Sequence, residues 1–135
     1  MVLNGKPIGN RNAYDYFRKE GREELRKEVY AAFDRLSARY NPVVMEGAGS
    51  LAEINLRETD LVNMAMHAKA DVILVGDIDR GGVFASVYGS LMLLTPEERK
   101  RVKGILINKF RGDIRLFEPG IKMLEDLCGI PVLGV

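Results

Sequence analysis

The sequence predicts an α/β fold built on a doubly wound, mostly parallel sheet, and three observations carry this prediction. Short apolar runs rich in β-branched residues alternate with segments of helical period along the 135-residue chain. Turn-forming residues flank each run, as they flank buried parallel strands. The order strand, helix, strand, helix is that of βαβ units, which build a parallel sheet with right-handed crossovers and helices on both faces.

Four apolar runs predict the strands of this sheet. They occupy residues 42–45, 71–75, 102–107 and 130–135. In such a sheet, ligands bind at the carboxyl ends of the strands. The residues that follow each run are therefore the first candidates for a functional site.

Helices are predicted between and after these runs. They cover residues 22–40, 60–69 and 82–94, a short segment after Thr95, and residues 116–128. Thr95 and Pro96 have the form of an N-cap followed by a proline at the first helical position. The last helix is expected to stop at Gly129, because glycine readily adopts the left-handed conformation that ends helices. One domain, or part of one, fits this length, and no repeat or linker interrupts it.

Composition and charge exclude several classes of protein. The chain carries 20 Lys and Arg against 19 Asp and Glu, so its charge does not indicate a nucleic-acid partner. It has no apolar run approaching the ~20 residues that span a bilayer and no signal-peptide pattern at its N-terminus, which predicts a cytoplasmic protein without a membrane partner. Its single cysteine, Cys128, offers neither an internal disulfide nor a metal-ligand spacing, and we expect it to be a small buried hydrophobe.

Glu46 stands at the tip of the first predicted strand, followed by a loop of small residues that includes Gly47 and Gly49. Such a loop lets the backbone approach a ligand closely. Since Mg²⁺ takes only one or two protein carboxylates and fills its other positions with water and phosphate oxygens, Glu46 fits a nucleotide–metal site. A sharp turn with an exposed acid explains the same residues equally well.

Asp77, Asp79 and Arg80 follow the second predicted strand, just before a helix N-terminus. The helix dipole and the free N–H groups there favour an anion, while the two carboxylates could orient a metal or a charged substrate. The alternative is structural, because two neighbouring acids need a counter-ion and Arg80 supplies one.

Asn108 and Lys109 follow the third predicted strand. A carboxamide presents a donor and an acceptor together, which reading the edge of a purine base requires. Lys109 adds positive charge that suits the phosphates of a nucleotide, although basic residues at such positions are often only surface residues.

Several catalytic patterns are absent from the sequence. Nothing matches the phosphate-binding motif G-x-x-x-x-G-K-[ST], so a phosphate cradle would have to lie elsewhere. No nucleophile elbow or Ser-His-Asp arrangement is evident, which sets hydrolase chemistry aside. The only histidine, His67, lies within a predicted helix beside Met64 and Met66, and we interpret it as structural.

Three motifs, in the same order, resemble signatures of the cobyric acid synthase family. Residues 44–57 read VMEGAGSLAEINLR and continue as DLVNM at 60–64, residues 75–85 read VGDIDRGGVFA, and residues 107–113 read INKFRGD. The final stretch, GIPVLGV at 129–135, resembles the end of the family's first domain. The resemblance covers almost the whole chain.

This resemblance implies an ATP-dependent carbon–nitrogen ligase whose synthetase domain is similar to dethiobiotin synthetase, a relative of the P-loop proteins. ATP would activate the b, d, e and g carboxylates of adenosylcobyrinic a,c-diamide as acyl phosphates, and ammonia from a class I glutaminase domain would convert them to amides. By position, Glu46 matches the acid that helps hold Mg²⁺, and Asn108 matches the asparagine that reads adenine. Asp77, Asp79 and Arg80 lie where the corrinoid carboxylates and the acyl phosphate would be handled.

The chain departs from the family in size. It lacks the N-terminal strand, the phosphate loop and the glutaminase domain, so we expect a fragment of the synthetase domain that is inactive alone and works with the glutaminase domain of the full-length chain. Two other hypotheses are a stand-alone α/β binding module and a related cobyrinic acid a,c-diamide synthase. A truncated sheet also exposes an edge and an apolar face, which raises the hypothesis of a homodimer.

Overall fold

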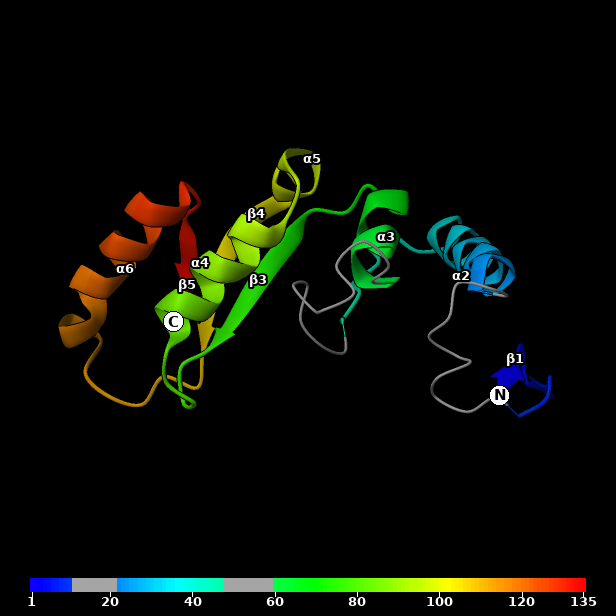
Figure 1. Ribbon diagram of the computed structural model, residues 1–135, viewed down its shortest axis with the longest axis horizontal. Coiled ribbons are helices and arrows are strands. Elements are labelled where there is room, and N and C mark those ends of the chain that lie inside the picture. The colour runs from blue at the N-terminus through cyan, green and yellow to red at the C-terminus, as the bar shows by residue number, and fades with distance from the viewer. Residues whose placement is uncertain (11–21, 48–59) are drawn as a thin grey trace. The chain divides into compact units, whose positions relative to one another are not determined.

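The computed structural model describes residues 1–10, 22–47 and 60–135, which fall into two compact units, Met1–Val44 and Met45–Val135 (Figure 1). The first unit holds a small hairpin of β1 (Val2–Leu3) and β2 (Lys6–Pro7) and the helix α2 (Arg22–Ser37). Asn4 and Gly5 join the two strands with positive φ angles of 50° and 77°. An Asn-Gly pair suits this type of turn, and it was the signal in the sequence that our prediction did not use.

The second unit holds a three-stranded parallel sheet in the order β3-β4-β5 (Figure 1). These strands are β3 (Val72–Asp77), β4 (Val102–Asn108) and β5 (Val132–Gly134). The strands predicted at 71–75 and 102–107 are confirmed, each running on to a polar residue at its carboxyl end, and the last strand is shorter than predicted. In the register of β3 and β4, Asp77 lies opposite Asn108.

The first predicted strand, at residues 42–45, is wrong, because these residues have no regular secondary structure. A strand needs a neighbour to hydrogen-bond with, and no described strand pairs with this run. Pro42 also has no N–H to donate, and Val44 is 90% exposed. Apolar composition alone therefore does not make this short run a strand.

Four helices accompany the sheet within the described residues 60–135. They are α3 (Asp60–His67), α4 (Val83–Leu93), α5 (Pro96–Arg99) and α6 (Ile114–Cys128). The predicted cap of α5 is confirmed, since the Thr95 side chain accepts from the N–H of Glu98 and the Glu98 side chain accepts from the N–H of Thr95. None of the described helices has the length and apolar character needed to cross a bilayer.

The ends of α6 show how capping sets helix boundaries. The helix starts two residues before its predicted start, because the carboxylate of Asp113 accepts a hydrogen bond from the N–H of Arg115 at 3.0 Å and caps it. Its predicted end at Gly129 is confirmed, where φ is 66°.

The core lies between the sheet and the helices α4 and α6 (Figure 1). A Cβ atom at Gly76 of β3 would lie only 2.8 Å from Val83 and 2.9 Å from Val87, which places α4 directly on the sheet. Phe84 of α4 stacks on Phe117 of α6 with ring centroids 5.9 Å apart. Ile105 at the centre of the sheet is fully buried.

The two faces of the sheet differ in their cover. Both crossovers advance along the sheet in the same direction, so right-handed connections bring α4 and α6 to the same face. On the other face, Ile73, Val75 and Leu133 are each about half exposed. A doubly wound sheet is covered by helices on both faces, but the described residues leave much of this second face exposed.

Candidate functional site at the carboxyl ends of the strands

Asp77 and Asn108 form the centre of the candidate site. They are the last residues of β3 and β4 and lie opposite each other in the sheet register. The backbone next to them is also tied together, since the N–H of Ile78 donates to the carbonyl of Asn108 at 3.1 Å. Both candidates thus stand at the carboxyl ends of their strands, and the register brings these two strand ends together at one edge of the sheet.

Lys109 joins the two strand ends through its side chain. Its Nζ lies 2.6 Å from Oδ2 of Asp77, a residue 32 positions earlier in the sequence. The backbone of Lys109 has a φ of 63°, a left-handed conformation that is uncommon for residues other than glycine. Sequence analysis did not find this ion pair, because the partner of Lys109 depends on the register of the two strands.

The carboxylate of Asp77 is held in its charged form. The hydrogen bond from Lys109 is the main reason that the pKa of Asp77 lies below its usual value, against a partial burial that acts to raise it. The N–H of Asp79, which donates to Oδ1 at 3.0 Å, and the positive charges of Lys109 and Arg80 lower this pKa further. Asp77 is therefore an anionic acceptor across the neutral pH range.

The segment between Asp77 and α4 exposes charged side chains over a turn rich in glycine. Asp79 and Arg80 are both exposed and therefore accessible to a ligand. Gly81 and Gly82 follow with φ angles of 77° and 67°, a conformation that glycine adopts without strain. Gly82 supplies no side-chain cap to α4, so N–H groups in the first turn of this helix keep no side-chain partner at that position.

Aromatic packing anchors the loop that follows β4. Phe110, two residues after Asn108, packs on Phe117 of α6 with ring centroids 5.2 Å apart. Because Phe117 also stacks on Phe84 of α4, the loop is attached to both helices that cover the sheet. The sequence analysis missed the packing of Phe110 on Phe117, because its only signal was one apolar residue within a polar motif at the strand end.

Glu46 and Gly47 lie in an exposed segment without regular secondary structure, and Gly49 lies outside the described residues. No hydrogen bond or ion pair joins Glu46 to another described residue. The described part of the chain also holds no group of three or more His, Cys, Asp or Glu side chains suited to a metal ion. The structure therefore brings Asp77, Asn108 and Lys109 together and leaves the role of Glu46 as a prediction.

Cys128 and His67 lie away from these strand ends. Cys128, the last residue of α6, packs against the core, and its partial burial raises the pKa of its thiol. A raised pKa disfavours the nucleophilic thiolate, which agrees with the prediction of a packing role. His67 is exposed at the end of α3.

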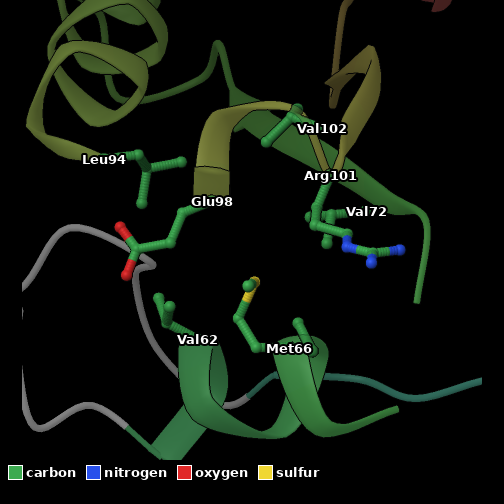
Figure 2. Close-up of a pocket in the computed structure, with 8 residues that line it drawn as sticks. Val62, Met66, Val72, Leu94, Glu98, Arg101 and Val102 are labelled. Atoms are coloured by element: carbon green, nitrogen blue, oxygen red, sulfur yellow. The ribbon is translucent and has the colours of Figure 1, made fainter. Parts of the chain in front are cut away.

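A small apolar pocket lies at the opposite, amino end of the sheet (Figure 2). Val72 and Val102, the first residues of β3 and β4, line it together with Val62 and Met66 of α3. Glu98 and Arg101 also line the pocket, but apolar atoms contribute nearly all of its surface, whereas a nucleotide needs several charged and hydrogen-bonding partners. This pocket does not compete with the carboxyl edge as a nucleotide site.

Comparison with known proteins places this geometry in a family. The family model described as "AAA domain" matches residues 12–135. The chain is 84% identical to the cobyric acid synthase of Bacteroides fragilis, 80% identical to that of Phocaeicola vulgatus and 60% identical to that of Parabacteroides distasonis. All of this chain is covered in each case, but it spans only 28% of the length of these relatives. No solved structure matches the chain.

Proposed function

The chain belongs to the AAA domain family, and we propose that it is part of the ATP-using synthetase domain of a cobyric acid synthase. The observation that carries the proposal is the identity of 80–84% to cobyric acid synthases over the whole chain. The three polar residues gathered at the carboxyl ends of β3 and β4 support it, because this is the edge where α/β sheets bind ligands. The relatives are named as synthases of cobyric acid, so their name gives cobyric acid as the product.

The proposed reaction is the amidation of peripheral carboxylates on a corrinoid, adenosylcobyrinic a,c-diamide. A carboxylate oxygen attacks the γ-phosphorus of ATP and ADP leaves, which gives an acyl phosphate. Ammonia released from glutamine by a glutaminase domain of the full-length chain then attacks the acyl carbon, and phosphate and a proton leave. We place both steps in the cytoplasm.

In this proposal Asn108 reads the adenine base through its carboxamide, next to Lys109, and the glycines at positions 47 and 49 allow close approach to the nucleotide. Arg80 is exposed and can neutralise charge on the acyl phosphate or on a substrate carboxylate. Asp77 and Asp79 orient the corrinoid side chain. The motif that would cradle the phosphates does not occur in this sequence.

Glu46 is the residue that would hold Mg²⁺. It is an exposed carboxylate, and the described residues offer no cluster of three potential ligands. This fits a magnesium ion bound mainly through water and phosphate oxygens rather than by a cage of protein groups. The ion supplies charge neutralisation for phosphoryl transfer when bound.

The experiment that tests this function uses the full-length protein that carries this chain. It is incubated with Mg²⁺, ATP and adenosylcobyrinic a,c-diamide, with either glutamine or ammonium as the nitrogen source, and the corrinoid products are identified by mass spectrometry. We expect stepwise amidation from both sources, with ADP formed in step. Ammonium bypasses the glutaminase, so amidation from ammonium isolates the synthetase reaction.

The outcomes distinguish the alternative functions. Amidation of cobyrinic acid at its a and c carboxylates, with no reaction of the a,c-diamide, would identify a related a,c-diamide synthase. No ATP consumption with either corrinoid would favour a binding module instead. The isolated 135-residue chain is expected to show no turnover above buffer.

A further inference from the structure

Lys109 contacts both of the residues that face each other at the strand ends. Its side chain reaches Asp77 of β3, with 2.6 Å between Nζ and Oδ2. Its backbone N–H donates to Oδ1 of Asn108 at 2.9 Å. One residue therefore fixes a carboxylate on one strand and a carboxamide on the next.

The left-handed backbone of Lys109 makes this double contact possible. A φ of 63° turns the chain sharply after β4 instead of continuing the strand. For a residue with a Cβ atom this conformation carries strain, so the surrounding structure must hold it. The ion pair to Asp77 and the anchoring of Phe110 on Phe117 are the contacts on either side of the turn that do so.

The ion pair differs from the other charged pairs of this unit. Its two side chains are 45% and 30% exposed and belong to residues 32 positions apart. The pair Lys122–Asp126 on α6 joins residues four positions apart, with side chains 77% and 65% exposed. A local, largely exposed pair of that kind contributes little to structure, whereas the Lys109 pair links two strands.

We propose that Lys109 is a positioning residue of this site, which holds the Asp77 carboxylate with its ammonium group and the Asn108 carboxamide with its backbone N–H. The hydrogen bond to Oδ1 of Asn108 fixes the orientation of the carboxamide, and Oδ1 keeps a second lone pair, so the NH₂ group and Oδ1 can both meet the edge of a base. Lys109 acts through these two side chains and does not itself bind the phosphates. This inference rests on the proposed function, which supplies the reaction that the site serves. It assigns Lys109 a positioning role within that site.

The kinetic test uses the full-length protein with Lys109→Met, Asp77→Asn and the double variant. Lys109→Met removes the ammonium group and keeps the backbone N–H, and we expect it to lower kcat/KM for the corrinoid about 10- to 100-fold through misplacement of Asp77. Since both changes break one interaction, the double variant should stay within about twofold of Asp77→Asn. Lys109→Gly, which suits the left-handed turn, should lose as much as Lys109→Met.

Lys122→Met is the matched control, because it removes a lysine from an ion pair on α6 away from the strand ends. It should leave kcat/KM unchanged. Losses that multiply in the double variant, together with a raised KM for ATP in Lys109→Met alone, would overturn the proposal and make Lys109 a direct phosphate ligand.

A second measurement separates this inference from the proposed function. The ¹³C resonance of the Asp77 carboxyl is titrated by NMR in the full-length protein, without any substrate. Lys109→Met should raise the midpoint towards that of an ordinary aspartate, while Lys122→Met should not move it. An unchanged midpoint in Lys109→Met would contradict the positioning role even if the full-length protein amidates corrinoids. A raised midpoint would support the positioning role even if the full-length protein does not amidate corrinoids.

Discussion

The helix-covered face of the sheet and its carboxyl edge are built on different physics, although their residues are neighbours in the sequence. Ile105 and Ile107 of β4 are 0% and 3% exposed beneath α4 and α6. Asn108, the next residue, is exposed and engaged in hydrogen bonds. The face is held by close packing, and the edge is held by an ion pair and hydrogen bonds. Stability and function should therefore respond to different substitutions.

The largest loss of stability is expected from Ile105→Ala. Ile105 is fully buried at the centre of the sheet, so removing its side chain leaves a cavity and should lower the free energy of unfolding by ~2–5 kcal/mol. Denaturant unfolding of the 135-residue chain, followed by circular dichroism, measures this loss. Ile105→Val is the graded control and should cost ~0.5–1.5 kcal/mol. Equal losses in both variants would mean that the face is not tightly packed.

Gly76→Ala tests the contact between α4 and the sheet. The added Cβ would meet Val83 at 2.8 Å and Val87 at 2.9 Å, so we expect a loss of ~1–3 kcal/mol in the same unfolding experiment. Gly89→Ala within α4 is the matched control, because its Cβ would meet nothing within 4 Å. That variant should gain ~0.5–1 kcal/mol from lower backbone entropy. A stabilising effect at Gly76 would show that α4 does not lie on β3 as described.

Asp77→Asn tests the edge through its dependence on pH. The pKa of Asp77 lies below its usual value of 3.8, so its charged form stabilises the folded chain above that value. This contribution is lost as the pH falls through the lower pKa of the folded state. Between pH 6 and pH 2 the wild type should therefore lose more stability than Asp77→Asn, and by less than either core change costs. Parallel curves for the two proteins would show that the ion pair with Lys109 is not formed.

Lys122→Met is expected to have the smallest effect. Its pair with Asp126 is a solvated pair of helix neighbours, and such pairs contribute only ~0.3–0.5 kcal/mol. Thermal unfolding in low and high salt measures this contribution. A larger loss would mean that surface charge holds α6 in place, and the contrast between packed face and charged edge would be weaker.

The fold was predictable where local patterns decide the structure. Apolar periodicity predicts two strands of the sheet. The capping preferences of single residues predict the end of α6 at Gly129 and the cap of α5 at Thr95. The structure of residues 42–45 could not be predicted in this way, because a strand depends on a pairing partner that composition does not reveal. The hairpin at Asn4 and Gly5 carried a usable local signal.

The site was predictable only in part. Asp77 and Asn108 could be placed at one edge, because polar residues after parallel strands share that edge. The pairing of Lys109 with Asp77 could not be predicted, since it depends on the register of two strands and on a left-handed turn. The approach of Glu46 to this edge stays a prediction, and Gly49 lies outside the described residues.

The most direct test of the central claim, that the carboxyl edge of β3 and β4 is the nucleotide-binding edge of an amidating synthetase, is corrinoid-dependent ADP release by the full-length protein carrying Asn108→Ala. Gly89→Ala, on the outer part of α4, serves as its control. We predict that Asn108→Ala raises KM for ATP about tenfold or more, because it removes a contact to the base, while the unfolding midpoint stays unchanged. ADP release by Asn108→Ala with the KM of the wild type would contradict the claim.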